Sequence, residues 1–140
     1  MLRFKMTLNT VVLAIVMTVG SSFASNVFAE SFPSEKGCKA LENPTAVQKG
    51  WCLSVNRRKG NCLACHVMVI DAWPEGFPQG GNIGPPLVAM KQRFPDREKL
   101  RSQIYDPTTV NSSSRMPPFG KHKILSDEDI ETIIEFLYSI

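Results

Sequence analysis

The sequence has few of the residues and motifs on which most enzymes depend. Only two histidines occur in its 140 residues, and it contains no recognisable Ser-His-Asp set, phosphate-binding loop or pair of catalytic carboxylates. The net charge of +3 is also too small to indicate a protein that binds nucleic acid. These absences argue against independent acid–base catalysis and against a nucleic-acid partner.

Strand-like alternation is lacking as well, as are internal repeats and low-complexity tracts. Ten prolines and nine glycines predict many turns. Apolar spacing predicts helices over residues 45–58, 87–93 and 96–105, and a final helix that begins at the cap Ser126. The sequence therefore predicts an all-α fold of about three or four helices. Its long loops need something to order them within a compact domain.

The first 29 residues have the features of a secretory signal peptide. Two basic residues precede an apolar stretch over residues 11–17, and small residues lead to a cleavage site after Ala29. Cleavage after Ala24 and an uncleaved membrane anchor are alternatives, although the apolar run is shorter than the ~20 residues of a spanning helix. We therefore expect export to the periplasm.

The rest of the chain divides into an N-terminal extension, residues 30–44, and a single domain, residues 45–140. A domain of this size buries a modest core and gains from a staple or a cofactor. In an oxidising compartment Cys38 and Cys52 are expected to pair as a disulfide. The alternative is that Cys52 serves as a redox thiol or an iron ligand.

Residues 62–66 form a C-x-x-C-H motif, the attachment sequence of c-type haem. Two cysteines at this spacing can both reach the vinyl groups on one edge of a porphyrin. The next residue, His66, then projects beneath the ring and offers a nitrogen to the iron. Because haem is attached outside the cytoplasm, the signal peptide supports this interpretation. We therefore predict one covalent haem c bound through Cys62 and Cys65.

Three other interpretations of the motif stay open. A thioredoxin-like dithiol uses C-x-x-C, but it needs no adjacent histidine and expects a βαβ setting that the sequence lacks. A zinc site has four possible ligands, although their spacing fits no familiar finger: Cys62, Cys65, His66 and His122. A match over five residues can also arise by chance in a structural protein.

Met116 is the strongest candidate for the second iron ligand. His122 is the only other histidine, and Met68 is too close to the motif to cross the ring. Met90 falls within a predicted helix, where it suits the core. Two prolines follow Met116 and restrict its loop. A thioether there would give His/Met ligation with a raised reduction potential, and the alternative is an ordinary packing residue.

A Gly84-Pro85 turn lies between the motif and Met116. The turn, with Pro85 as its candidate site residue, can place a backbone carbonyl against the far ring nitrogen of His66. Such a contact would fix the tautomer and the orientation of the ring. On its own, the dipeptide is equally typical of an ordinary turn.

Basic and aromatic residues accompany these motifs. The cations of residues 57–59, with Lys121 and Lys123, could surround an exposed haem edge and steer an acidic partner, or could be ordinary surface charge. Three aromatic side chains could cover the apolar faces of a haem or belong to a general core: Trp73, Phe77 and Phe119.

Together these motifs resemble those of class I cytochromes c. The resemblance rests on the C-x-x-C-H motif, on Gly84-Pro85-x-Leu87, on the Met-Pro-Pro-Phe run at 116–119 and on the amphipathic C-terminal helix. It covers nearly all of the chain that follows the signal peptide. Within that family the chain is similar to SoxX, the small monohaem subunit of the SoxAX complexes of sulfur-oxidising bacteria. The supporting segments are residues 58–66, 105–108, 116–120 and 124–129.

The SoxX resemblance implies a periplasmic electron-transfer subunit that is not catalytic alone. In SoxAX complexes, SoxX forms a heterodimer with the larger haem subunit SoxA. The complex, an L-cysteine S-thiosulfotransferase, couples thiosulfate oxidatively to a cysteine of a carrier protein. The expected partners are therefore a SoxA-like subunit, an electron-acceptor cytochrome and, through the complex, the carrier protein. The family's haem-attachment positions match Cys62 and Cys65, its proximal ligand matches His66 and its distal ligand matches Met116.

Two other functions stay open at this point. A free cytochrome c could shuttle electrons in a respiratory chain. It should then have a small contact patch with a charged rim, whereas an obligate subunit should have a large apolar patch beside the haem. A five-coordinate haem that binds or converts a small ligand would require that Met116 does not bind the iron.

Overall fold

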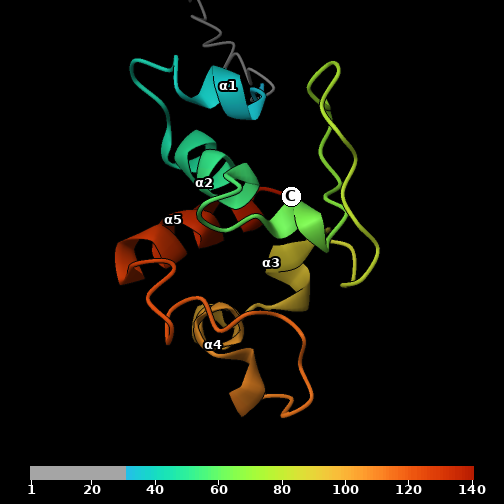
Figure 1. Cartoon of the computed structure of the whole chain (residues 1–140), viewed down its shortest axis with the longest axis vertical. Coiled ribbons are helices and arrows are strands. Elements are labelled where there is room, and N and C mark those ends of the chain that lie inside the picture. Colours follow the sequence, from blue (N-terminus) through green and yellow to red (C-terminus); the bar gives the residue numbers. More distant parts are fainter. Residues whose placement is uncertain (1–30) are drawn as a thin grey trace, which may run out of the picture.

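The structure is a computed structural model that describes residues 31–140 (Figure 1). The signal peptide predicted for residues 1–29 lies outside these residues. The helical segments, in chain order, are α1 (Glu35–Cys38), α2 (Ala46–Val55), the 3₁₀ helix η1 (Cys62–Ala64), α3 (Met90–Arg93), α4 (Arg97–Tyr105), the 3₁₀ helix η2 (Pro107–Thr109) and α5 (Asp127–Leu137). Residues 31–140 contain no strand, so the predicted all-α class is confirmed. None of these helices has the length and apolar character needed to cross a membrane.

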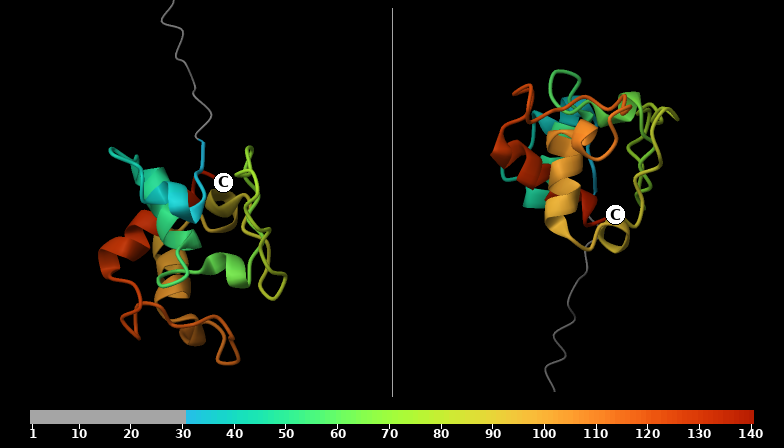
Figure 2. Two further views of the ribbon diagram at one scale, coloured as in Figure 1. Left: turned by 45° about the horizontal axis from the view of Figure 1, so that its top comes forward. Right: turned by 90° about the horizontal axis from the view of Figure 1, so that it is seen from below.

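Helices α2 and α5 pack against each other and cross at Gly50 (Figure 2). A Cβ added at Gly50 would lie 2.2 Å from the carbonyl oxygen of Thr132, so only glycine permits this approach. Trp51 from α2 and Phe136 from α5 are fully buried beside the crossing, with ring centroids 5.5 Å apart. The crossing provides the rigid core on which the remaining segments pack.

Helix α2 begins as predicted and ends earlier than predicted. Thr45 and Gln48 form a capping box at its start. The helix stops at Val55 rather than near residue 58, because Asn56 has an extended backbone (φ −68°, ψ 116°). The amide of Gly60 then donates a hydrogen bond of 3.1 Å to the carbonyl of Leu53. This bond turns the chain back along α2 and delivers residues 62–66 beside the helix.

The short helix predicted for residues 87–93 is also shorter in the structure. Leu87 pairs instead with the segment after the motif: its amide donates to Val67 O at 2.8 Å, and its carbonyl accepts from the amide of Val69 at 3.0 Å. Ala89 has a left-handed backbone (φ 49°), which separates this pairing from the helix. Helix α3 can therefore begin only at Met90, whose side chain is buried.

The N-terminal extension contains a helical turn that the sequence did not reveal. Ser34 caps α1, a single helical turn within the N-terminal extension. A disulfide joins Cys38 at the end of this turn to Cys52 in α2, with an S–S distance of 2.03 Å. The indole of Trp51 donates a 2.6 Å hydrogen bond to the carbonyl of Pro33. The extension is therefore packed against α2, and a four-residue helix held by such contacts leaves no periodic pattern in the sequence.

Helices α4 and α5 match their predicted positions closely, after the caps Asp96 and Ser126. Two arginines of α4 bind one carboxylate of α5. Arg97 Nη2 lies 2.8 Å from Glu131 Oε2, and Arg101 Nε lies 3.1 Å from Glu131 Oε1. These ion pairs hold α4 alongside α5.

Candidate functional site

A cavity of about 610 Å³ opens between the C-x-x-C-H segment, α4, α5 and the loop that contains Met116. Its volume lies within the range of roughly 300–1,000 Å³ that is usual for small-molecule and cofactor sites. Much of the wall is apolar and comes from the inward faces of the helices: Leu100, Ile104, Ile133 and Leu137. The residues that the sequence predicted for haem binding, Cys62, Cys65, His66, Pro85 and Met116, all line this one cavity.

The C-x-x-C-H motif forms a tight turn that places its three functional side chains on the cavity wall. Asn61 adopts a left-handed conformation (φ 45°) just before η1. The carbonyl of Cys62 then accepts hydrogen bonds from the amides of Cys65 (3.1 Å) and His66 (2.9 Å). Both thiols are free. The motif therefore presents two unpaired sulfurs and one imidazole to the same space.

Burial affects the protonation of one of these thiols. Enclosure by protein atoms raises the pKa of Cys62 to about 11, and a hydrogen bond from Ser54 offsets only part of this shift. The Cys62 side chain is thus a neutral thiol at neutral pH. A neutral thiol is a poor nucleophile, which disfavours a dithiol exchange role for this cysteine.

A backbone contact orients His66. The carbonyl oxygen of Pro85 lies 2.7 Å from Nδ1 of the imidazole. Since a carbonyl can only accept, Nδ1 carries the proton in this contact and Nε2 keeps its lone pair. The Gly84 amide also donates a 2.8 Å hydrogen bond to the carbonyl of Cys65, which ties the turn to the motif. The ring is therefore held in the tautomer that can coordinate a metal through Nε2.

Two methionines line the cavity, and they differ in surroundings. Met90 is 2% exposed, and its sulfur accepts a 3.7 Å contact from Nη1 of Arg93, as befits a core residue. Met116 lies in the loop after η2, where its amide donates to Ser114 Oγ at 3.2 Å. Met68 is buried elsewhere and does not line the cavity. Met116 is thus the methionine that a loop offers to the cavity, while Met90 fills the core as expected.

The zinc interpretation is not supported by the arrangement of side chains. Within residues 31–140, no three His, Cys, Asp or Glu residues come together in a way that could hold a metal ion. His122 is absent from the wall onto which Cys62, Cys65 and His66 open. The four proposed zinc ligands are therefore not assembled.

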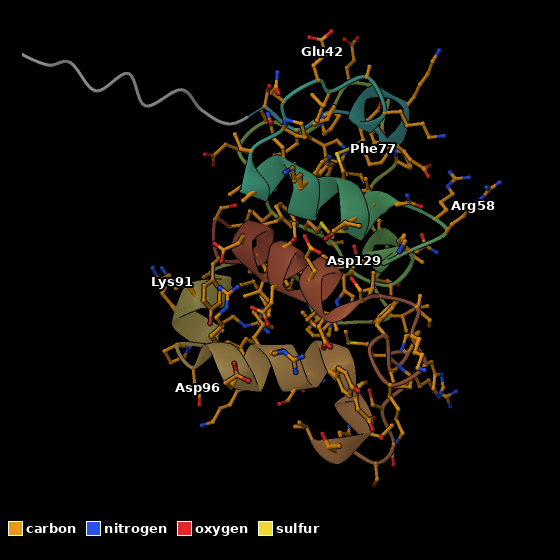
Figure 3. All side chains as sticks on the ribbon, turned by 90° about the vertical axis from the view of Figure 1, so that its left-hand side faces the viewer. Glu42, Arg58, Phe77, Lys91, Asp96 and Asp129 are labelled. Atoms are coloured by element: carbon orange, nitrogen blue, oxygen red, sulfur yellow. A yellow bond between two sulfur atoms is a disulfide. The ribbon has the colours of Figure 1, made fainter. Side chains whose placement is uncertain are left out.

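Positive charge surrounds the cavity. The lining includes five cations and no acidic residue: Arg57, Arg58, Lys59, Arg93 and Arg115. Arg58 extends outward from the loop after α2 at the edge of the molecule (Figure 3). Arg93 and Arg115 were missed from the sequence, although each neighbours a lining methionine, Met90 at one helical turn and Met116 directly. Lys121 and Lys123 do not line this cavity.

The three aromatic candidates have different positions. Phe119 lines the cavity. Trp73 and Phe77 do not, because they pack on Trp51 with centroid distances of 5.8 and 6.0 Å. Together with Phe32, these side chains surround Trp51 of α2 and pack the N-terminal extension against that helix. Trp73 and Phe77 are therefore structural, and sequence alone could not separate the two roles.

No family model matches the chain. An uncharacterized lipoprotein of Aquifex aeolicus is 34% identical over 84 residues, which make up 58% of this chain and 37% of that protein. The chain thus spans well under two thirds of that relative's length.

A solved structure has the same fold. A chain in the crystal structure of SoxXA from P. pantotrophus superposes with a TM-score of 0.56 at 24% sequence identity, covering 70% of this chain and 83% of that one. The chain has the class I cytochrome c fold. The predicted fold is thereby confirmed, with its helices and long loops arranged around the cavity that contains the C-x-x-C-H motif.

Proposed function

We propose that this chain is a periplasmic electron-transfer protein that carries one covalently attached haem c. The observation that carries the proposal is the single cavity, in a cytochrome fold, that is lined by Cys62, Cys65, His66 and Met116. When bound, haem supplies a one-electron redox centre. The proposed domain organisation is a signal peptide (residues 1–29), an extension (residues 30–44) and a cytochrome domain (residues 45–140).

The cavity residues suit this group chemically. The free sulfurs of Cys62 and Cys65 supply the two thioether links. His66, with Nδ1 held by Pro85, offers Nε2 to the iron, and Met116 offers a soft thioether. The apolar walls would shield a bound ring from water, and the cations of the lining would suit its carboxylates.

With both His66 and Met116 as ligands, the iron would have no open position for a substrate, so the chain would transfer electrons rather than catalyse a reaction alone. Met116 is therefore the residue that separates electron transfer from the alternative of a five-coordinate, ligand-binding haem.

The finer proposal is that the chain is the SoxX-like subunit of a SoxAX complex. It is supported by the fold shared with a SoxXA chain and by the sequence segments that resemble SoxX. In this role the chain pairs with a larger SoxA-like haem subunit. It accepts the electrons released when thiosulfate is coupled to a carrier-protein cysteine, and passes them to an acceptor cytochrome.

A free electron shuttle is the second candidate. The cations of the cavity lining support it, because positive charge beside a redox site steers transient encounters with an acidic partner. Arg57 and Lys59 are paired with Glu35 and Asp129, so this steering would rest mainly on Arg58, Arg93 and Arg115.

The first experiment tests haem attachment and ligation. The full chain is produced in a host that matures c-type cytochromes, and a denaturing gel is stained for covalent haem. We expect a stained band and a low-spin spectrum. Met116→Ala should shift the ferric iron to high spin, whereas the control Met90→Leu, on the same wall, should leave it low-spin. An unstained band would overturn the proposal, and an unchanged Met116→Ala spectrum would favour a different distal ligand or none.

Gentle purification from the native periplasm separates the two candidate roles. A larger haem protein that co-elutes in fixed ratio, with activity toward thiosulfate and a thiol carrier, would support the SoxAX subunit. A lone small cytochrome that exchanges electrons rapidly with an oxidase would support the shuttle.

A further inference from the structure

The loop that contains Met116 forms its hydrogen bonds locally. In the part of the chain that the structure describes, the hydrogen bonds of residues 108–118 all end within residues 106–122. Local turns such as Asn111 N to Pro107 O (2.9 Å) shape the loop but do not fix it to a helix. The loop is thus held in place by the packing of Met116 against the core and by its two ends, and not by hydrogen bonds to α2 or α5.

Those two ends meet at the C-terminal end of α4. The carbonyl of Tyr105 accepts hydrogen bonds from the amides of Gly120 (3.1 Å) and Lys121 (3.2 Å). A Cβ added at Gly120 would lie 2.0 Å from Cδ2 of Tyr105, so the backbone at the returning end of the loop lies directly on that ring. Helix α4 itself is fixed by Arg101, whose Nε binds Glu131 of α5. The start and the end of the loop are therefore joined on a rigid support.

One charged side chain closes this junction. Asp106 is only 7% exposed, and it is one of two buried polar residues in the described chain. Its Oδ2 accepts a 2.7 Å hydrogen bond from Nζ of Lys121 at the returning end. Its Oδ1 accepts from the amide of Thr108 at 3.1 Å, and also from the Thr108 hydroxyl, at the outgoing end. The carboxylate thus binds both ends of the loop at once.

We infer that Asp106 is a positioning residue that keeps the Met116 loop closed over the cavity, through its ion pair with Lys121. This inference rests on the proposed haem function, since it assigns Asp106 the task of holding a distal ligand in place. Hydrogen bonds to charged groups are among the strongest in proteins. Loss of this one should let the loop open more often while α2, α4 and α5 stay folded, because the side chains of Asp106 and Lys121 bond to each other and to Thr108 rather than to α2 or α5.

Imidazole reports this opening directly. As a neutral ligand at about pH 8, it can bind ferric iron only when Met116 has left. Its apparent affinity rises in proportion to the fraction of molecules in the open form. Asp106→Asn keeps the shape of the side chain but loses the charge. We expect it to lower the apparent dissociation constant for imidazole by roughly tenfold or more, with the low-spin His/Met spectrum retained when imidazole is absent.

Two matched controls separate positioning from general stability. Glu131→Gln removes the charge that joins α4 to α5 and should lower the denaturation midpoint without changing imidazole affinity. Lys121→Gln tests the other partner of the junction and should behave like Asp106→Asn, whereas Lys123→Gln, which removes a nearby exposed charge, should behave like the wild type. Lys121 is 56% exposed, so its replacement leaves the fold intact and decides the question even if Asp106→Asn does not fold.

The outcomes distinguish this inference from the function on which it rests. If the wild-type protein shows methionine ligation but Lys121→Gln and Asp106→Asn bind imidazole no more tightly than Lys123→Gln, the positioning role is overturned and the haem function stands. If Glu131→Gln tightens imidazole binding to the same degree, the effect is general destabilisation and the role is again overturned. If the wild-type protein holds no methionine-ligated haem, both are overturned together.

Discussion

The backbone of Gly84 lies directly against the imidazole of His66: a Cβ added at Gly84 would be 2.3 Å from Cε1 and 2.8 Å from Nε2 of the ring. The neighbouring Pro85 carbonyl holds Nδ1 at 2.7 Å. The orientation of the ring therefore depends on two successive residues. Gly84 leaves room for the ring because it has no side chain, and Pro85 holds Nδ1 through its backbone carbonyl. This arrangement explains why a glycine precedes the proline at this turn.

Gly84→Ala should therefore disturb His66 specifically. A methyl group at this position must push the ring away or move the turn, and either change weakens the contact with Pro85 and the alignment of Nε2. We expect a lower yield of haem-loaded protein and a changed reduction potential, measured by haem staining and by potentiometric titration. Gly76→Ala is a suitable control, because a Cβ there meets nothing within 4 Å although the backbone (φ 67°) is unfavourable. Equal effects from both variants would contradict the proposed role of Gly84.

Removal of the disulfide should weaken the fold and spare the cavity. Cys38 and Cys52 are 14 positions apart, and closure of such a loop contributes ~3 kcal/mol in the chain-entropy model. The Cys38→Ser, Cys52→Ser double variant should lose about this much free energy of unfolding, which corresponds to roughly 10–20 °C in melting temperature for a domain of this size. Neither cysteine lines the cavity, so the haem spectrum should not change. A loss of haem attachment in this variant would show that the N-terminal extension shapes the site.

Stability should depend on pH through Asp106. Hydrogen bonds from Lys121 and Thr108 hold the pKa of this carboxyl below its ordinary value. A group whose pKa is lowered by folding stabilises the protein above its unfolded pKa, about 3.9, and this contribution is lost as the pH falls through the lower folded value. The wild type should therefore exceed Asp106→Asn in unfolding free energy at neutral pH, and the difference should shrink in acid. Urea denaturation across this pH range measures it, and a difference independent of pH would contradict the role of the charge.

Short-range patterns in the sequence were enough to predict the haem motif, helix α5 and the candidate ligand Met116. The C-x-x-C-H motif is contiguous, so its chemistry could be inferred without the fold. Helix α5 could be placed from Ser126 and the spacing of Ile130, Ile133 and Leu137, because a cap and an amphipathic face are both short-range signals. Met116 could be proposed because few other ligands exist in the chain.

The tertiary structure decided the features that depend on contacts between distant segments. The end of α2 at Val55 follows from the bond between Gly60 and Leu53, and the late start of α3 follows from the pairing of Leu87 with residues 67–69. No helix propensity records such bonds, because the partner lies outside the window that a periodic pattern covers.

The same distinction applies to the site. The sequence by itself determined which atoms are available: two thiols, one imidazole beside them and a thioether in a proline-restricted loop. Only the tertiary structure decided that they line one cavity, that Trp73 and Phe77 belong to a different cluster, and that Asp106 joins the ends of the Met116 loop. Composition and spacing define a set of chemical groups, whereas their convergence depends on close packing between residues far apart in the chain, such as the approach of α2 to α5 at Gly50.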